Sequence, residues 1–531
     1  MDMTATPGAG LRAGRREWTG LAVLAMPTLL LSLDISVLYL ALPHLSAELG
    51  ASSAEQLWIL DIYSFMLAGF LITMGTLGDR IGRRRLLLIG AGAFGVASVL
   101  AAYSTSPEML IATRALLGIA GATLMPSTMA LIRNMFHDPK QMGQAIGVWF
   151  SCFMGGMLLG PLVGGILLEH FWWGSAFLLG VPFMVLLLVA GPLLLPEYRD
   201  AAAGRLDLTS VALSLAAILP AIYGLKEMAR NGWEPSAVLA IVTGAAVAVV
   251  FVRRQRMLAD PLLDLRLFSN RTFSSALGVM LAAGVVMAGI ALQATLYLQM
   301  VEGLSPLAAG RWLVPQNVAM IIGFLVAPSL ARRFRPAYVI AAGLAIAGAG
   351  LLLHTRVDSV GGLDLLVAGL VLASFGIALP MALTANLILG SAPPEKAGSA
   401  ASMSETSGEF GIAVGIASLG SLGTFVYRNE LTDTLPADLP PEAATIARES
   451  IAAAMSTAQQ LTGSLGTDLI DVGRAAFTTG LNVVGAVGAV VFIGLAIVAA
   501  TVLRRVGPIG ESAVEAEAVV AQKGQIVEGV D

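Results

Sequence analysis

The sequence predicts an all-helical integral membrane protein, and its composition and one pattern along the chain support that class. Apolar residues make up 56% of the 531 residues even without the 59 glycines, and charged residues only 12%. Soluble domains typically contain about 45–50% apolar residues with glycine included and about 25% charged residues. The pattern is a series of long apolar runs, separated by short polar loops, between Thr19 and Val502.

Fourteen of these runs are long enough to cross a bilayer as helices, which takes about 17–25 residues each. We expect spans at residues 19–43, 56–78, 86–105, 109–132, 142–167, 175–195, 207–227, 235–252, 274–300, 308–330, 337–354, 363–390, 399–425 and 476–503. The first run lacks a small-residue cleavage site and is too long for the apolar core of a signal peptide. We therefore expect it to remain as the first membrane helix.

Lys and Arg residues fall unevenly on the two sides of these spans. If the N-terminus is cytoplasmic, 23 of the 31 Lys and Arg residues lie in cytoplasmic loops and ends. Cytoplasmic loops of membrane proteins carry an excess of these residues, so this orientation is preferred. The pair Arg504 and Arg505 then returns to the cytoplasm after an even number of crossings. Both ends, residues 1–18 and 504–531, are expected to be cytoplasmic.

The composition argues against several other classes of protein. A single cysteine, Cys152, excludes an internal disulfide framework, and the four scattered histidines have no metal-ligand spacing. A formal charge of −4 is not the basic footprint of a nucleic-acid-binding protein. The sequence also lacks the H-E-x-x-H pair of a metalloprotease and the Gly-Lys of a phosphate-binding loop. We therefore expect no enzyme, no metal, no cofactor and no nucleic-acid partner.

An internal repeat indicates two related halves. Four residues in and before the fifth span recur at a constant offset of 255 residues around the thirteenth span. They are Pro139, Gly143, Gly156 and Gly160, matched by Pro394, Gly398, Gly411 and Gly415. The turn Leu-Gly-Asp-Arg-Ile at 77–81 has a degenerate partner, Leu-Ala-Arg-Arg-Phe, at 330–334. Parallel repeats are typical of secondary transporters with a substrate site between the halves; a chance match of glycine-rich helices is the alternative.

The repeat predicts a domain organisation. Residues 19–195 and 274–503 are expected to form two six-helix bundles, with two inserted transmembrane helices at 207–252 between them. Residues 426–475 are expected to form a long extracytoplasmic loop, in which residues 440–461 are compatible with a short amphipathic helix. A lid or hairpin and a merely solvated loop remain open alternatives for this segment.

The loop between the second and third spans carries a dense set of glycines and charges. Its residues are Gly75, Gly78, Asp79, Arg80, Gly82, Arg83 and Arg84. Glycines permit a tight, closely packed turn, and the acid and the arginines offer charge-assisted hydrogen bonds. On the residues alone, the loop is either a positive-inside anchor or a contact at a moving boundary.

The string Gly-x-x-x-Asp-Arg-x-Gly-Arg-Arg closely resembles the signature loop of the major facilitator superfamily, and the resemblance extends over nearly the whole chain. It implies the major facilitator fold, in which Asp79 meets the N-terminus of a helix of the other half and latches one conformation. The helix dipole favours such a contact. The copy in the second half lacks the acid, since Arg332 stands in its place.

The fifth span carries a second motif, formed by Gly156, Gly160, Pro161, Gly164 and Gly165. Glycines four residues apart let helix backbones approach closely, and a proline removes a backbone donor and bends the helix. Packing alone accounts for an isolated glycine pair. The full string Gly-x-x-x-Gly-Pro-x-x-Gly-Gly, however, resembles the antiporter motif that marks exporters within the superfamily.

Further segments resemble the fourteen-span drug:H+ antiporters of the QacA type. They are Leu33–Pro43 in the first span, Trp58–Ser64 in the second, Trp172–Phe177 before the sixth and Asp260–Phe268 before the ninth. The resemblance implies a monomeric multidrug exporter in lipid, in a bacterial inner (plasma) membrane, which exchanges lipophilic cations such as quaternary ammonium compounds and dyes for inward protons. An exporter of the same fold dedicated to one antibiotic or metabolite is the alternative.

Ionisable residues inside the predicted spans are the candidates for proton coupling and substrate binding. They are Asp34, Asp61, Arg114, Glu405 and Glu409. A charge in hydrocarbon is costly and is usually kept for function. At a rise of about 1.5 Å per residue, Asp34 and Glu409 lie near the middle of the bilayer, and Glu405 shares a helix face with Glu409.

A carboxyl group in this setting is expected to hold either a proton or a cationic drug. Desolvation disfavours the charged form, and competition between the proton and the drug for one group is sufficient for antiport. The stretch Leu110–Gly118 resembles the fourth-span motif of the family, whose arginine is tied to proton coupling. Whether Arg114 pairs with Asp34 or with Asp61 stays open, as does a purely structural ion pair.

Overall fold

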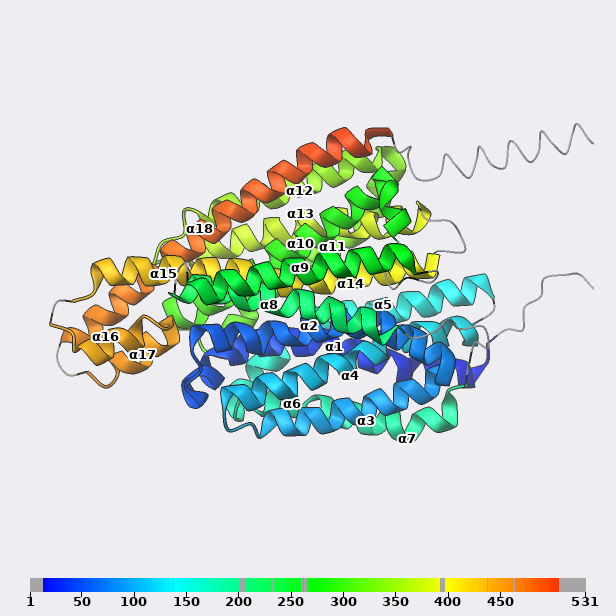
Figure 1. Cartoon of the computed structure of the whole chain (residues 1–531), viewed down its shortest axis with the longest axis horizontal. Coiled ribbons are helices and arrows are strands. Elements are labelled where there is room, and N and C mark those ends of the chain that lie inside the picture. Colours follow the sequence, from blue (N-terminus) through cyan, green and yellow to red (C-terminus); the bar gives the residue numbers. More distant parts are fainter. Residues whose placement is uncertain are drawn as a thin grey trace, which may run out of the picture.

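The protein is helical throughout the part of the chain that the structure describes. The computed structural model describes residues 13–136, 138–197, 199, 207–231, 234–258, 261, 265–391, 397–436, 438–461 and 464–505. Every regular element in these ranges is a helix (Figure 1). The predicted all-helical membrane class is therefore confirmed. The predicted cytoplasmic ends fall largely outside these ranges, as does Pro394 of the repeat.

The first seven helices cover the first six predicted spans. They are α1 (Arg15–Leu49), α2 (Ser53–Ile81), α3 (Arg83–Ala102), α4 (Pro107–Met135), α5 (Pro139–His170), α6 (Ser175–Leu178) and α7 (Gly180–Leu194). Serines placed directly before apolar runs start two of them. Ser52 accepts from the amide of Glu55 at the start of α2, and Ser106 accepts from the amide of Met109 at the start of α4. Such caps satisfy amides that the first helical turn leaves without a partner.

The rest of the chain forms a longer series of helices. They are α8 (Leu208–Asn231), α9 (Pro235–Met257), η1 (Leu265–Ser269), α10 (Arg271–Leu296), η2 (Tyr297–Val301), α11 (Pro306–Arg333), α12 (Pro336–His354), α13 (Leu363–Gly390), α14 (Ala397–Gly415), η4 (Ile416–Gly420), α15 (Ser421–Thr434), α16 (Pro441–Ala447), α17 (Ile451–Ala458), α18 (Ser464–Val502) and η5 (Leu503–Arg505). The short π-helical element η2 continues α10, and η4 joins α14 to α15.

The expected count of fourteen spans is not confirmed. Among the described residues, eleven helices are long and apolar enough to cross a membrane, or twelve if α1, with its bend of 42°, counts as one span. The expected second and seventh spans fall on α2 and α8. The apolar part of α8, Leu208–Gly224, is shorter than the other candidates.

The helices before α8 and those after α9 lie in two groups, on opposite sides of these two helices (Figure 1). In the first group α1 packs along α5 and α2 along α4, and in the second α10 packs along α14 and α12 along α13 and α18. Two long contacts join the groups. We call the contact of α2 with α14 the first seam and the contact of α5 with α11 the second seam. Any movement of one group against the other takes place at these seams.

The helices α8 and α9 lie against the first seam. Ile222 of α8 belongs to a buried apolar cluster with Phe65 of α2 and with Ala413 and Ala417 of α14 and η4. The helix α9 leaves apolar side chains such as Leu239 exposed, as expected for a helix that faces lipid. The helix α8 therefore contacts both groups of helices.

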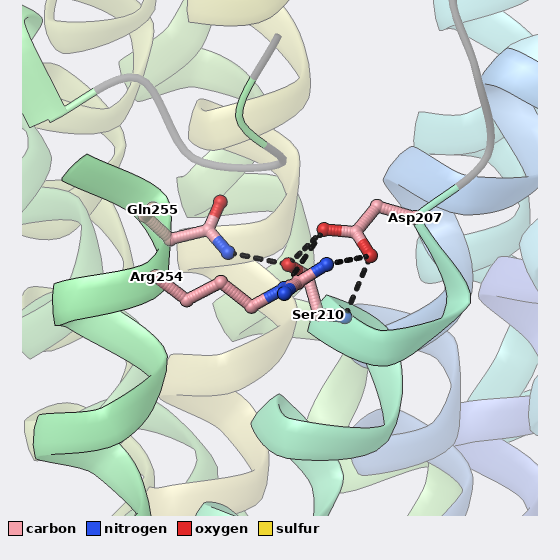
Figure 2. A network of polar contacts seen from close by, with 4 residues as sticks. All are labelled: Asp207, Ser210, Arg254 and Gln255. Atoms are coloured by element: carbon pink, nitrogen blue, oxygen red, sulfur yellow. Dashed lines mark hydrogen bonds and ion pairs between the residues drawn. The ribbon is translucent and has the colours of Figure 1, made fainter. Parts of the chain in front are cut away.

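A polar network joins the ends of α8 and α9 (Figure 2). The carboxylate of Asp207 accepts from Arg254 at both oxygens, with Oδ1 2.9 Å from Nη2 and Oδ2 3.3 Å from Nε. Ser210 donates to Asp207 and accepts from Gln255, whose Nε2 lies 2.6 Å from Oγ. Hydrogen bonding to Arg254 lowers the pKa of Asp207 below its ordinary value. The network fixes the two helices to each other where they leave the membrane.

Replacing Asp207 by asparagine is expected to lower the stability of the protein by about 0.2–1 kcal/mol at neutral pH, because the pair is partly exposed. Since the pKa of Asp207 is lowered in the folded protein, its contribution is present above the unfolded pKa of about 3.9. It is lost as the pH falls through the folded pKa, so the two proteins should converge in acid. Thermal unfolding of both proteins across pH checks this. Asp433→Asn, an exposed acid on α15, is the control, and an equal loss in the control would contradict a specific role for the network.

A helical hairpin, α16 and α17, lies at one end of the molecule (Figure 1). Both helices fall within the segment 440–461, for which a short helix and a solvated loop were both open. The hydroxyl of Tyr427 donates to the carbonyl of Ala447 at 2.9 Å, and the amide of Gln56 on α2 donates to Ser450 at 3.3 Å. A cavity of about 40 Å³ lies beneath, lined by residues of both groups of helices. The hairpin therefore contacts both groups at this end, which we call the hairpin end.

Candidate functional site

The structure places Arg114 of α4 against Asp34 of α1. The Nη1 atom of Arg114 lies 2.9 Å from Oδ2 of Asp34, and the two side chains are only 2% and 11% exposed. The Nε atom donates to the carbonyl of Ile59 at 3.2 Å, and the guanidinium carbon lies 4.6 Å from the ring centroid of Tyr63. The open choice between Asp34 and Asp61 is thus decided for Asp34 in this conformation. Because the pair is buried, loss of either partner would leave a charge without a counterion in the protein interior, which is strongly unfavourable.

Asp61 of α2 is completely buried close to this pair. It interacts electrostatically with Tyr39 of α1, as do Arg114 and Glu409. Tyr63 interacts in the same way with Asp34, Glu409 and Arg114. The two tyrosines therefore lie between charges that come from α1, α2, α4 and α14.

Glu405 and Glu409 lie one turn apart on α14, at the first seam. Ser64 of α2 hydrogen-bonds to Glu409 across the seam, and Glu405 and Glu409 interact electrostatically. Glu405 also interacts with Arg133 of α4. Within the described part of the chain, the Oε2 atom of Glu409 is buried and has no hydrogen-bond partner. Acids from both groups of helices thus lie around one seam, inside the membrane-spanning helices.

The glycine motif of α5 packs against helices of both groups. A Cβ atom on Gly156 would lie 2.5 Å from the carbonyl oxygen of Leu29 on α1, and one on Gly160 2.6 Å from Cβ of Ser36. Gly164 is close to Val37 in the same way, with a Cβ atom 3.1 Å from the Val37 Cα. The first three glycines therefore allow the backbones of α5 and α1 to pack closely, as small residues do between membrane helices.

The end of the same motif lies at the second seam. A Cβ atom on Gly165 would lie 2.5 Å from Cα of Leu307 on α11, and one on Gly310 would overlap the carbonyl of Pro161. The close packing of α5 against α1 recurs in the other group, where Gly411 and Gly415 allow α14 to pack closely against α10. At 416, the position that matches Pro161 in the repeat, α14 changes into the π-helical element η4. At the matching point α5 carries a proline and α14 a π-helical segment, and π-bulges are frequent at functional sites.

Replacing Gly156 by alanine is expected to cost about 1–3 kcal/mol of stability, because the added methyl group overpacks the contact with α1. Gly147 of the same helix supplies the matched control, since a Cβ atom there has no neighbour within 4 Å. Gly147→Ala should be neutral or stabilise the helix by about 0.5–1 kcal/mol. Thermal unfolding of both variants checks this. Equal effects would show that helix propensity, and not packing, decides.

The charged loop between α2 and α3 contacts the end of α7. Gly82 has a φ of +110°, which favours glycine, and a Cβ atom there would lie 2.5 Å from Oε1 of Glu197. Arg84 lies 3.5 Å from Oε2 of Glu197 and donates to the carbonyl of Leu195 at 2.9 Å. Glu197 was not a sequence candidate, because its position after the sixth span resembles that of any loop acid. Its contact fixes the loop within the first group.

The other members of this loop are placed as follows. A Cβ atom on Gly78 would lie 3.0 Å from Cδ of Arg83, whereas one on Gly75 has no neighbour within 4 Å. Arg83 is buried and Arg80 is half-buried. The side chain of Asp79, for which a latch to the other half is expected, lies outside the described residues. The loop therefore supports a packed turn, and the latch stays a prediction.

No metal site is found among the residues that the structure describes, since no three His, Cys, Asp or Glu side chains are grouped to hold an ion. His137 lies outside these residues.

Comparison with known proteins gives a consistent result. The sequence profile of the Major Facilitator Superfamily matches residues 24–416. The multidrug efflux pump LfrA of Mycolicibacterium smegmatis is 40% identical over 494 residues, which cover 93% of this chain and 98% of LfrA. The methyl viologen resistance protein SmvA of Salmonella typhimurium is 36% identical over 87% of this chain and 93% of SmvA. The tetracenomycin C resistance and export protein of Streptomyces glaucescens is 30% identical over 93% of this chain and 92% of that protein.

A solved structure supports the fold. A bacterial homolog of the human lysosomal transporter Spinster, in an inward-facing and unoccupied conformation, matches with a TM-score of 0.66 over 93% of this chain and 98% of that one. At 15% sequence identity this likeness concerns the fold alone.

Proposed function

The chain belongs to the major facilitator superfamily, and from this premise we propose that it exports small lipophilic cations in exchange for inward protons. It is a multi-pass membrane transporter with relatives named for drug efflux and resistance. We propose three things about this transporter: the class of compound that it exports, its coupling to protons and the residues that carry both.

One observation carries it: the buried ion pair of Asp34 with Arg114 and three further acids lie close together inside the membrane-spanning helices, around the first seam. The acids are Asp34, Asp61, Glu405 and Glu409, and the arginine is Arg114. If all were ionised, the cluster would carry a large negative charge in hydrocarbon, which is very costly. Bound protons or a bound organic cation remove this cost. Such a cluster therefore selects cationic ligands and makes them compete with protons.

Competition at the first seam then couples the two movements. A cationic drug that enters next to Glu409 replaces the proton there, because the carboxyl group cannot stably hold both. The Ser64 hydroxyl adjoins Glu409 from the other group, so the contact across the seam depends on what Glu409 holds. Asp34, whose carboxylate lies 2.9 Å from Arg114, has the same role on α1. Loading with drug from one side and with protons from the other drives the halves between their two orientations.

The orientation and the membrane belong to the same proposal. The distribution of Lys and Arg supports cytoplasmic ends, and the relatives from bacteria support the plasma membrane. The protein needs no second copy to complete the charged cluster, since one chain supplies all of its members. We therefore propose a monomeric transporter with lipid as its other partner.

A second candidate is an exporter dedicated to one antibiotic or metabolite. The relative from Streptomyces glaucescens, named for a single compound, supports this alternative. A panel of structurally unrelated lipophilic cations separates the two. Transport of several unrelated cations favours multidrug export, and transport of one compound favours the dedicated exporter.

The test of the function uses everted membrane vesicles with an energised inward proton gradient. Adding a lipophilic monocationic dye to vesicles with the protein is expected to dissipate the pH gradient, because each exported cation returns protons. Vesicles without the protein and a neutral dye of similar hydrophobicity are the controls. If the gradient stayed unchanged while the dye accumulated inside, export would not be coupled to protons and the proposal would be wrong.

A further inference from the structure

A polar side chain crosses the second seam near the middle of its two helices. The side-chain amide of Asn317 on α11 donates to the main-chain carbonyl of Met157 on α5, with Nδ2 and O 2.8 Å apart. Pro161 lies four residues after Met157 and has no N–H group, so α5 itself cannot donate to this carbonyl. A carbonyl without a donor is costly inside the membrane. Asn317 therefore supplies the donor that Pro161 removes.

The bond lies between two other contacts along the same seam. Toward the hairpin end, Gly165 approaches the backbone of Leu307. Toward the opposite end, the rings of Phe150 and Phe324 pack edge to face, with centroids 6.0 Å apart. When two rigid bodies rock against each other, contacts at the two ends of a seam open in turn, and those near the middle move least. The position of the bond is therefore that of a pivot.

The internal repeat places a matching bond in the first seam. The turn at 77–81 recurs 253 residues later at 330–334, and Asn317 lies 253 residues after Ser64. Ser64 crosses the first seam to Glu409, as Asn317 crosses the second to Met157. The acceptors differ in position, since the offset of 255 residues between α5 and α14 matches Met157 with Ile412 and not with Glu409. They also differ in chemistry. Glu409 has a carboxyl group that binds a proton, whereas a main-chain carbonyl keeps the same accepting oxygen in every state.

We propose that Asn317 is a positioning residue whose bond to the Met157 carbonyl is the fixed pivot of the second seam, kept in both orientations of the halves. The first seam carries the variable bond, between Ser64 and Glu409. The pivot holds whichever substrate is carried, so it goes beyond the function proposed above and does not depend on it.

The experiment measures distances between spin labels at both ends of the full-length protein in lipid, with Cys152 replaced by serine. One pair of labels, at Tyr103 and Val360, reports on the hairpin end, and a second pair, at Leu193 and Phe334, on the opposite end. All four side chains are exposed, and each pair has one member in each group of helices. Asn317→Ala removes the donor, and Asn317→Asp keeps the size but replaces the amide donor with a carboxylate.

Both variants are expected to broaden the distance distributions at both ends, since both ends lose their common fixed point. The ratio of the two orientations should change by less than about twofold, because the lost bond contributes equally to both. Asn482→Ala is the matched control: it removes a side-chain bond to the carbonyl of Val357, 3.2 Å long, within one group. It should leave both distributions unchanged.

A double-mutant cycle with Pro161→Ala identifies the partner of Asn317. Alanine at 161 lets α5 donate to Met157 itself, so Asn317→Ala should add no further broadening in that background. The labels report on inactive protein too, so the cycle stays readable if Pro161→Ala stops export. A shift at one end only would make Asn317 a latch, and unchanged distributions would make it a simple packing residue. Either result, or additive effects of the two substitutions, would overturn the proposal.

Discussion

Replacing Asp34 by asparagine is expected to abolish drug-driven proton movement and to destabilise the protein. The substitution keeps the shape of the side chain and removes the charge that lies 2.9 Å from Arg114. Arg114, with a side chain only 2% exposed, then stays buried without its counterion. Removing one partner of a buried ion pair lowers the stability by about 3–5 kcal/mol. The pH gradient of everted vesicles and thermal unfolding of the purified protein measure the two effects.

The double variant Asp34→Asn with Arg114→Gln separates the two effects. It removes the uncompensated charge together with the acid, so most of the lost stability should return. Proton coupling should stay absent, because no carboxyl group remains at position 34. If coupling returned with stability, Asp34 would serve folding only, and the assignment of this acid would be incorrect.

Replacing Glu409 by glutamine is expected to abolish the release of protons when a lipophilic cation binds. Glutamine keeps the length of the side chain and the bond to Ser64, so packing at the first seam should change little. It carries neither a charge nor a removable proton, so the competition between drug and proton ends there. The measurement is proton release from purified protein in weakly buffered solution with a pH indicator. Glu405→Gln should reduce the release without abolishing it, because Glu409 remains.

Two controls accompany this variant. Glu430→Gln changes an exposed acid on α15, the helix that follows α14 and η4 in the chain. The protein with this substitution should release as many protons as the unsubstituted protein. Ser64→Ala removes the hydroxyl beside Glu409 and keeps the carboxyl group, so release should persist with altered pH dependence. Undiminished release from Glu409→Gln would move the proton site to another member of the cluster.

The candidate site was only partly readable from the sequence. An acid inside an apolar run is visible in one dimension, so Asp34, Asp61 and Glu409 stand out by hydropathy alone. Ser64 and Asn317 do not, since single hydroxyl and amide groups are common in membrane helices. Their partners lie on helices far away in the sequence. A change of one residue turns a side chain by about 100° around a helix, so small differences in helix rotation decide which groups meet.

The fold shows the same division. Hydropathy identified most of the helices, because crossing a bilayer is a requirement on each segment separately. The count of fourteen spans is not confirmed by the described residues, where α8 combines an apolar part with a polar end. The helices at the hairpin end were left open, because their stability comes from contacts with α2 and α15 that local composition does not encode.

Composition and periodicity by themselves determined that this chain is an all-helical membrane protein with acids in hydrocarbon and glycines at helix contacts. These are properties of each segment in its solvent, lipid or water, and they need no knowledge of neighbours. Only the tertiary structure decided that Arg114 pairs with Asp34 and that Glu197 binds Arg84 of the charged loop. It also decided that Asn317 donates to the Met157 carbonyl, which lacks the N–H donor of residue 161. These pairings depend on distances of a few ångströms between separate helices, which are set when the helices pack together.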